Sequence, residues 1–183
     1  VPTPSNMAAQ YTPDVALLGT DRYAIGWVDL RAGQEVYLQE YNTNSGLIGS
    51  NRLISAGDPA TVNWDLDAAV DRDGRLLLHW AAFEAEASIL GLRFDTNLNP
   101  IGSSETRNLS GSGQRWSPVG AFTTPDRFGV TWTELTSDQA DITFMLFDST
   151  GTRQLGAEPI VNDDSLGAIS RNPALAPGTN WYT

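Results

Sequence analysis

Two carboxylates recur at the end of what reads as the same strand, in the first and the third of three similar segments. Asp29 and Glu134 each lie two residues beyond a tryptophan, and Glu84 follows in the corresponding loop of the second segment. Pairs of carboxylates that flank a sugar linkage carry out glycoside hydrolysis. The second segment has Ala82 at the equivalent position. A carbohydrate-active enzyme that uses Asp29, Glu84 and Glu134 is therefore the alternative interpretation, not the main one.

A series of aromatic residues occurs just before the first strand expected in each segment. Tyr11, Trp64 and Trp116 form this series, and polar residues such as Asn63 and Gln114 lie beside them. An exposed ring could stack on a sugar ring, whereas a buried one would close the junction between two sheets. Both roles fit the pattern. Ligand binding by Tyr11, Trp64 and Trp116 is the binding site that the sequence predicts.

The stretch DRDGR, residues 71–75, places two aspartates beside a glycine. Calcium prefers several carboxylate oxygens that converge around such a turn, which makes Asp71 and Asp73 the candidate ligands. An EF-hand would need a glutamate at the twelfth position of the loop, where this chain has Ala82. Asp-Gly is also the ordinary pair of a tight hairpin. We prefer the hairpin and expect no cofactor, with calcium as the alternative.

His79 is the only histidine, and the chain has no cysteine. A catalytic histidine needs an oriented partner, and a zinc site needs several nitrogen or sulfur ligands. The sequence has no Gly-x-Ser-x-Gly nucleophile elbow. We therefore expect His79 to be a strand residue with an available hydrogen bond.

All of these residues belong to an internal repeat. Three segments, PDVALLGTDRYAIGWVD, LDAAVDRDGRLLLHWAA and PVGAFTTPDRFGVTWTE, each carry an alternating stretch that ends on a tryptophan. Trp27, Trp80 and Trp132 are therefore 53 and 52 residues apart. Large flat side chains bury the most area between neighbouring sheets, so the three tryptophans are expected in the core.

Each repeat contains four short extended stretches separated by Gly, Asp, Asn and Pro clusters that mark turns. In the second repeat we expect them at residues 67–70, 75–82, 87–94 and 105–109. No window has a sustained helical periodicity, so the predicted fold class is all-β. Four antiparallel strands per repeat are typical of a β-propeller blade.

The expected boundaries describe one repeat region over 183 residues. They give the end of a preceding blade at 1–10, repeats at 11–64, 65–116 and 117–171, and the start of a fourth repeat at 172–183. About three and a half blades are thus expected, whereas a propeller needs at least about four to close. Open sheet edges invite pairing with another chain. The expected partner is the remainder of a longer chain or another copy that completes the propeller, and we favour the first.

The repeat resembles one found in large secreted or surface-attached bacterial proteins, with the pattern Pro-x-Val-Ala, turn, Trp, Gln-x-Phe-Asp and a Gly-x-x-x-Gly corner. The first repeat matches at Pro13, Val15, Ala16, Trp27, Gln39, Tyr41, Gly46 and Gly49, and the third at Pro118, Ala121, Trp132, Phe147, Asp148, Gly151 and Gly156. The second departs from it, with Leu66 in place of the proline and Asn99-Pro100 in place of the first corner glycine. The resemblance implies propeller-forming adhesion or scaffold modules and does not specify an activity.

The charge of the chain excludes several partners. Against 11 basic residues there are 22 acidic ones, which gives a formal net charge of −11. Nucleic acid binding needs a basic stripe, so no nucleic acid is expected. No apolar run is long enough to cross a bilayer, so no membrane insertion is expected.

The sequence therefore favours a non-catalytic module, extracellular or at the cell surface, that recognises a glycan or a protein surface in adhesion or assembly. The alternative is part of a glycoside hydrolase or sialidase-like propeller enzyme that uses the rim carboxylates. Against it, the arginine triad and Ser-x-Asp-x-Gly-x-x-Trp boxes of sialidase-like propellers are missing.

Overall fold

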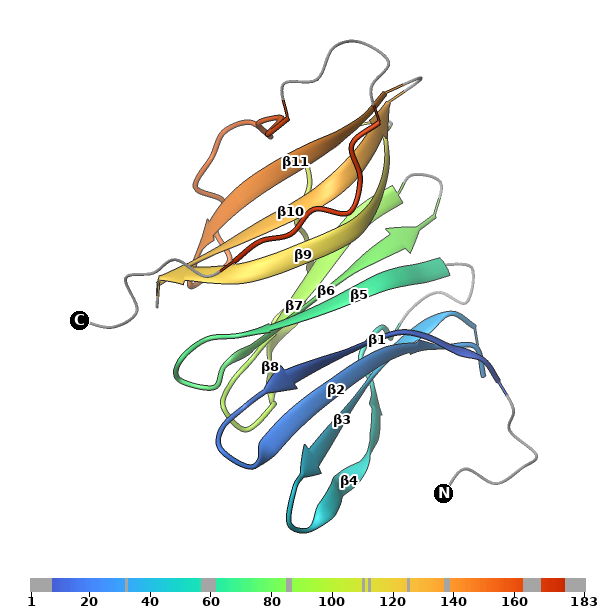
Figure 1. Ribbon diagram of the computed structural model, residues 1–183, viewed down its shortest axis with the longest axis vertical. Coiled ribbons are helices and arrows are strands. Elements are labelled where there is room, and N and C mark those ends of the chain that lie inside the picture. The colour runs from blue at the N-terminus through green and yellow to red at the C-terminus, as the bar shows by residue number, and fades with distance from the viewer. Residues whose placement is uncertain are drawn as a thin grey trace.

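The computed structural model describes residues 8–31, 33–56, 62–84, 87–109, 111, 113–124, 126–136, 139–162 and 169–176. These residues contain eleven strands and no helix, arranged as three antiparallel sheets that stand side by side like the blades of a fan (Figure 1). Accordingly, the described part of the chain offers no helix that could span a membrane. The predicted all-β, propeller-like fold is confirmed.

Each sheet follows the chain order of its strands. Blade 1 contains β1 (Gln10–Leu17), β2 (Arg22–Asp29), β3 (Glu35–Asn42) and β4 (Gly46–Leu53). Blade 2 contains β5 (Val62–Val70), β6 (Leu76–Phe83), β7 (Ala87–Phe94) and β8 (Pro100–Thr106). Blade 3 contains β9 (Gln114–Thr124), β10 (Arg127–Thr136) and β11 (Gln139–Asp148). Where a fourth strand of blade 3 is expected, Arg153 and Ile160 form only isolated antiparallel bridges to β11.

Two strands of the second repeat differ from their predicted ranges. The first strand begins at Val62, earlier than expected. A bulge between Trp64 and Asp67 interrupts the alternation, so the sequence pattern does not reveal the part of the strand before it. The fourth strand is Pro100–Thr106 and not 105–109. Pro100 reads as a strand breaker, but β8 is the edge strand of its sheet, where a missing N–H does little harm.

The first strands of the three blades lie next to one another, since β5 contacts β1 on one side and β9 on the other. Each of these inner strands contains a bulge at the equivalent point. Thr12, Asp65 and Ser117 adopt the left-handed conformation there, with φ of 43°, 50° and 50°, and Asn172 continues the series at 55°. Few non-glycine residues adopt this conformation, and bulges re-aim the side chains around them. The three bulges lie at the same height on neighbouring strands, so the inner edge of the three blades departs from regular strand geometry there.

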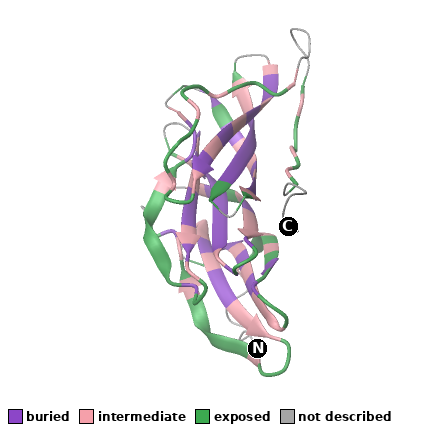
Figure 2. Ribbon diagram, turned by 90° about the vertical axis from the view of Figure 1, so that its left-hand side faces the viewer, coloured by how far each residue is buried: buried purple, intermediate pink, exposed green. Residues whose placement is uncertain are grey.

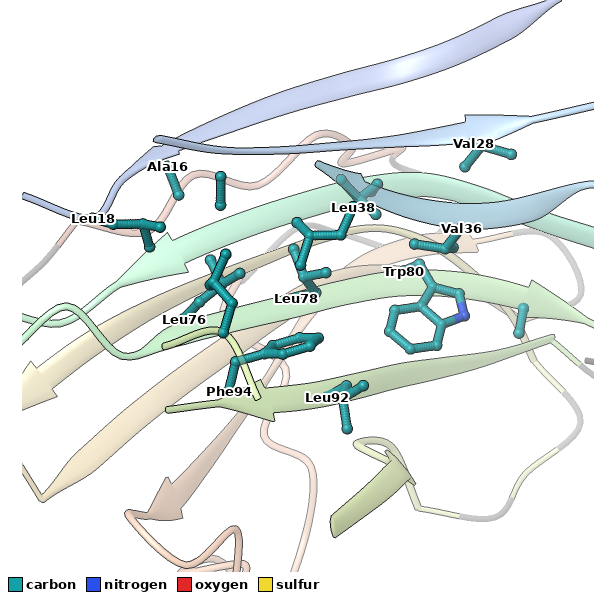
Figure 3. Close-up of a cluster of buried hydrophobic side chains, with 14 residues drawn as sticks. Ala16, Leu18, Val28, Val36, Leu38, Leu76, Leu78, Trp80, Leu92 and Phe94 are labelled. Carbon is teal, nitrogen blue, oxygen red and sulfur yellow. The ribbon is translucent and has the colours of Figure 1, made fainter. Parts of the chain in front are cut away.

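Two apolar layers hold the blades together. Between blades 1 and 2, Trp80 packs with Leu38 and Leu78 (Figure 3). Between blades 2 and 3, Trp132 packs in the second layer. Trp80 and Trp132 are 1% and 0% exposed, so their predicted core role is confirmed. Figure 2 shows the buried residues along the middle of the stack and exposed residues along its outer edge.

Trp27, the third repeat tryptophan, lies on the far face of blade 1 and is only half-buried. It stacks on Tyr37 with 6.0 Å between ring centroids, beside exposed Val15 and Leu17. No blade of the described residues covers this face. On the far face of blade 3, Asn172 donates its backbone N–H to the hydroxyl of Thr133, where a fourth repeat is expected to start. The three blades therefore form part of a propeller and do not close a ring.

Candidate functional site

The three aromatic residues predicted to bind a ligand lie on the inner strands, each directly before a bulge residue. Tyr11 and Trp64 are 39% and 36% exposed, and their ring centroids are 5.8 Å apart across the junction of blades 1 and 2. Trp116 is half-buried, and the guanidinium of Arg171 lies 5.8 Å from its ring centroid. The structure thus gathers the predicted aromatics on one edge of the fan. Their contact with a ligand stays a prediction.

A groove of about 390 Å³ crosses the inner strands at the bulge residues that follow these aromatics. The residues that line it are the bulge residues and those that follow them on each strand, namely Thr12, Pro13, Asp14, Asp65, Leu66, Asp67, Ser117, Pro118, Val119, Asn172 and Pro173. The groove therefore runs across all three blades, and its shape follows from the repeated bulge.

Three carboxylates face this groove, and each also joins one blade to the next. Asp14 accepts a hydrogen bond from the backbone N–H of Ala68 at 2.7 Å. Asp67 accepts one from Gly120 at 2.8 Å, and Asp65 accepts one from Ser117 at 2.9 Å. The inner edge thus combines acidic groups with exposed aromatic rings.

The surroundings of Asp14 in the groove change its proton affinity. Burial raises the pKa of Asp14, and the charge of Asp67 adds to the rise, although backbone hydrogen bonds from Ala68 and Val15 oppose it. Asp14 therefore keeps its proton to a higher pH than an ordinary aspartate. A carboxyl group with a raised pKa can act as a proton donor in acid–base chemistry.

Asp29, the first rim carboxylate predicted from the sequence, is buried at the end of β2. Its carboxylate accepts hydrogen bonds from Trp27 and Arg31. The Arg31 guanidinium lies 2.8 Å from Asp29 Oδ2, and the Trp27 indole N–H donates to the same oxygen at 3.2 Å. Burial on its own would raise the pKa of Asp29, but the hydrogen bonds from Arg31 and Trp27 outweigh it and hold the pKa below its usual value. These contacts are sufficient to account for this residue structurally.

Glu134 and Glu84, the other two rim carboxylates, also lie away from the groove. Glu134 on β10 pairs with the buried guanidinium of Arg115 at 2.6 Å. Glu84 is exposed and follows directly after β6. Neither residue lines the groove, and nor does Asp29. A catalytic role for the three stays a prediction.

The aspartates at residues 71–75 form a closed turn between β5 and β6. Asp71 Oδ1 accepts the backbone N–H groups of Asp73 and Arg75 at 2.9 and 2.8 Å, and the Arg75 guanidinium binds Oδ2 at 2.5 Å. Gly74 has a φ of 84°, which suits glycine. The strands on either side pair antiparallel, as the preferred hairpin interpretation requires. In the part of the chain that the structure describes, no group of three or more His, Asp or Glu side chains could hold a metal ion.

Sequence reasoning did not place Asp14 or Asp67 in a sugar-binding or catalytic site. A signal for them does exist, because the two acids are one repeat apart and each lies three residues beyond a junction aromatic. Thr-Pro, Ser-Pro and Asn-Pro at 12–13, 117–118 and 172–173 mark the same bulge. What the pattern does not convey is that a bulge turns these positions toward a groove.

Comparison with known proteins establishes the fold. No family model matches the chain, and no curated protein matches its sequence. Among solved structures, an endo-arabinase from Bacteroides thetaiotaomicron is similar with a TM-score of 0.62, 12% identity and 90% of this chain covered. A GH43 endo-arabinanase from Bacillus licheniformis gives 0.51, 17% and 85%. An ulvan lyase of polysaccharide lyase family PL25 gives 0.57, 11% and 83%.

These structures are carbohydrate-active enzymes, and the likeness at such low identity is one of fold. The chain spans 66%, 60% and 42% of their respective lengths. The described blades therefore correspond to part of a propeller of the kind found in these enzymes.

Proposed function

We propose that these blades belong to a carbohydrate-active propeller protein and that the groove on the inner strands binds a polysaccharide. One observation carries the proposal: exposed Tyr11 and Trp64 directly precede Thr12 and Asp65, which line one groove together with the carboxylates Asp14 and Asp67. The fold likeness to arabinanases and to a polysaccharide lyase supports the same class of ligand.

The chemistry of the groove fits a neutral sugar chain better than an acidic one. Aromatic faces offer an apolar surface for the C–H side of a sugar ring, and carboxylates accept hydrogen bonds from its hydroxyl groups. The formal net charge of −11 would repel a polyanion at long range. A soluble polysaccharide ligand also accords with a location outside the cell, which we propose with it.

The proposed reaction is hydrolysis of a glycosidic bond with Asp14 as the proton donor. Its raised pKa suits a proton donor, and Asp67 on the neighbouring blade is the second carboxyl group of the proposed reaction. Because these acids line the groove and the rim acids do not, Asp14 and Asp67 replace Asp29, Glu84 and Glu134 as our first choice.

Binding and turnover are to be measured separately on the purified protein. Trp64→Ala should weaken binding of linear arabinan about tenfold or more in affinity electrophoresis, a loss of about 1.4 kcal/mol. Ile48→Ala is the matched control, because Ile48 is 38% exposed but lies on the outer strand β4. Equal effects of the two substitutions, or no binding of any neutral polysaccharide, would contradict the proposal.

A non-catalytic binding module is the second candidate, and one observation favours it. Asp14 and Asp67 already accept backbone hydrogen bonds between blades, which gives both a structural role. The two candidates differ in the release of reducing ends from arabinan. Release that is lost in Asp14→Asn supports the hydrolase, whereas binding without release supports the module.

A further inference from the structure

A row of polar side chains leads from the groove into the interior of blade 2. Asp67, His79, Gly91 and Glu105 are cross-strand neighbours on β5, β6, β7 and β8, so they span the whole sheet at one level. Side chains of directly opposed residues share one face of a sheet. This face is the one that packs against blade 3.

His79 is enclosed at the centre of the row. It is 0% exposed, and neither ring nitrogen has a hydrogen-bond partner in the described residues. Its Nδ1 lies 3.8 Å from Asp67 Oδ2, too far for a direct hydrogen bond but close enough for an interaction between the imidazole dipole and the carboxylate in a buried place. Buried polar groups without partners are rare in native proteins and call for a reason.

Two glycines from different blades make room for this imidazole. A Cβ atom at Gly120 on β9 would lie 2.5 Å from His79 Nδ1, and one at Gly91 on β7 would lie 2.7 Å from His79 Cδ2. Neither distance is compatible with a side chain. The backbone of both blades is therefore shaped around His79.

Arg107 fills the gap that Gly91 leaves in the row. Its guanidinium carbon lies 5.4 and 5.2 Å from the ring centroids of Phe128 and Phe147 in blade 3. One of its nitrogens binds Glu105 at 2.8 Å, while Nε and Nη2 have no hydrogen-bond partner in the described residues. A buried cation thus lies behind His79 on the side away from the groove.

The other blades have no such row at this level. In blade 1 the row that starts at Asp14 continues with Gly26 and Leu38, and in blade 3 Val119 is opposite Thr131. The blade architecture therefore does not require a histidine here. The histidine is specific to the row that starts at Asp67.

We propose that His79 is a positioning residue for Asp67: it stays neutral, directs an Nδ1 proton at the carboxylate, and with Arg107 behind it fixes the position of that carboxylate in the groove. The charged and aromatic neighbours of His79 among the described residues fit this assignment. They are Asp67 on β5, Arg107 beyond β8 and the uncharged ring of Phe128 on β10, whose centroid is 6.3 Å from that of His79. Burial lowers the pKa of His79 and Arg107 lowers it further, while Asp67 opposes both.

The state of His79 can be measured without any ligand. Because the chain has one histidine, ¹⁵N labelling gives one pair of ring nitrogen signals, which distinguish the Nδ1–H tautomer, the Nε2–H tautomer and the imidazolium. We expect the Nδ1–H tautomer, unchanged on titration through the ordinary histidine pKa of about 6.5. Asp67→Asn should move these signals, while Asp14→Asn, the matched change one blade away, should leave them in place. An imidazolium, an Nε2–H tautomer or insensitivity to Asp67→Asn would overturn the proposal.

The consequence for the groove rests on the proposed function and is tested apart from it. His79→Asn retains a donor near the position of Nδ1 and should keep arabinan affinity within about threefold, whereas His79→Phe should lose about tenfold, close to 1.4 kcal/mol. Circular dichroism checks that both variants fold. An equal loss of affinity in both variants would show that His79 acts through packing alone and would overturn the proposal. If the wild-type protein binds no polysaccharide, the proposed function fails, and the nitrogen signals still decide the role of His79.

Discussion

The carboxylate of Asp67 accepts a hydrogen bond from the backbone N–H of Gly120, one blade further along the chain. The same bond, one repeat earlier, joins Asp14 to Ala68. One side chain position therefore does two things: it ties neighbouring inner strands together and presents an acid to the groove. In blade 3 the position is Val119, so the series of acids ends there.

Removing an acid from this series should loosen the junction that it bridges. Asp14→Ala leaves the N–H of Ala68 without its acceptor, and we expect a loss of about 1–3 kcal/mol in the free energy of unfolding. Asp14→Asn retains an acceptor oxygen and should cost less. Urea denaturation measures both. Equal losses for the two variants would show that the acceptor is not what matters.

The repeat tryptophans should differ in their contribution to stability. Trp80 is buried between blades 1 and 2, whereas Trp27 lies on a face that no described blade covers. Trp80→Ala should therefore cost about 3–5 kcal/mol, and Trp27→Ala clearly less. Denaturant unfolding followed by circular dichroism tests this. A loss at Trp27 as large as that at Trp80 would mean that another element covers Trp27 in solution.

The close approach of Gly120 to His79 predicts an energetic coupling between them. Gly120→Ala should cost about 1–3 kcal/mol, because the added methyl group meets the imidazole. The same substitution should cost less in a His79→Ala background. Gly156→Ala is the control, since nothing lies within 4 Å of a Cβ atom there. Additive losses in the double-mutant cycle would contradict the contact.

Acid stability should depend on Asp29. Its pKa is lower in the folded protein than its ordinary value of 3.8, so it stabilises the fold above that pH. The contribution is lost as the pH falls through the lower folded value. In Asp29→Asn we expect a flatter decline of the thermal midpoint below about pH 4 than in the wild-type protein. An unchanged decline would remove Asp29 as its source.

The repeat pattern predicted the blades because hydrophobic alternation and turn residues report directly on strand pairing. The positions of Trp80 and Trp132 followed from it, as did the gathering of Tyr11 and Trp64 on one edge. The acids of the groove did not follow, because a bulge shifts the register by a step that alternation alone does not reveal.

The rim acids illustrate the opposite difficulty. Asp29 and Glu134 occupy equivalent positions in the sequence, which suggested a shared site. In the structure each is held by its own arginine, Arg31 and Arg115, which lie at unrelated positions in the chain. Side-chain pairing of this kind depends on three-dimensional distances and has no periodic signature.

The polar row in blade 2 also distinguishes this blade from its neighbours. Chains built from similar units are prone to assemble them in the wrong order. A misplaced blade 2 would bury His79 and Arg107 without the bare backbone of Gly120 and without the two phenyl rings that receive the guanidinium. Unmatched buried charge is strongly unfavourable. The row therefore favours blade 3 over the other described blades as the unit that packs on this face.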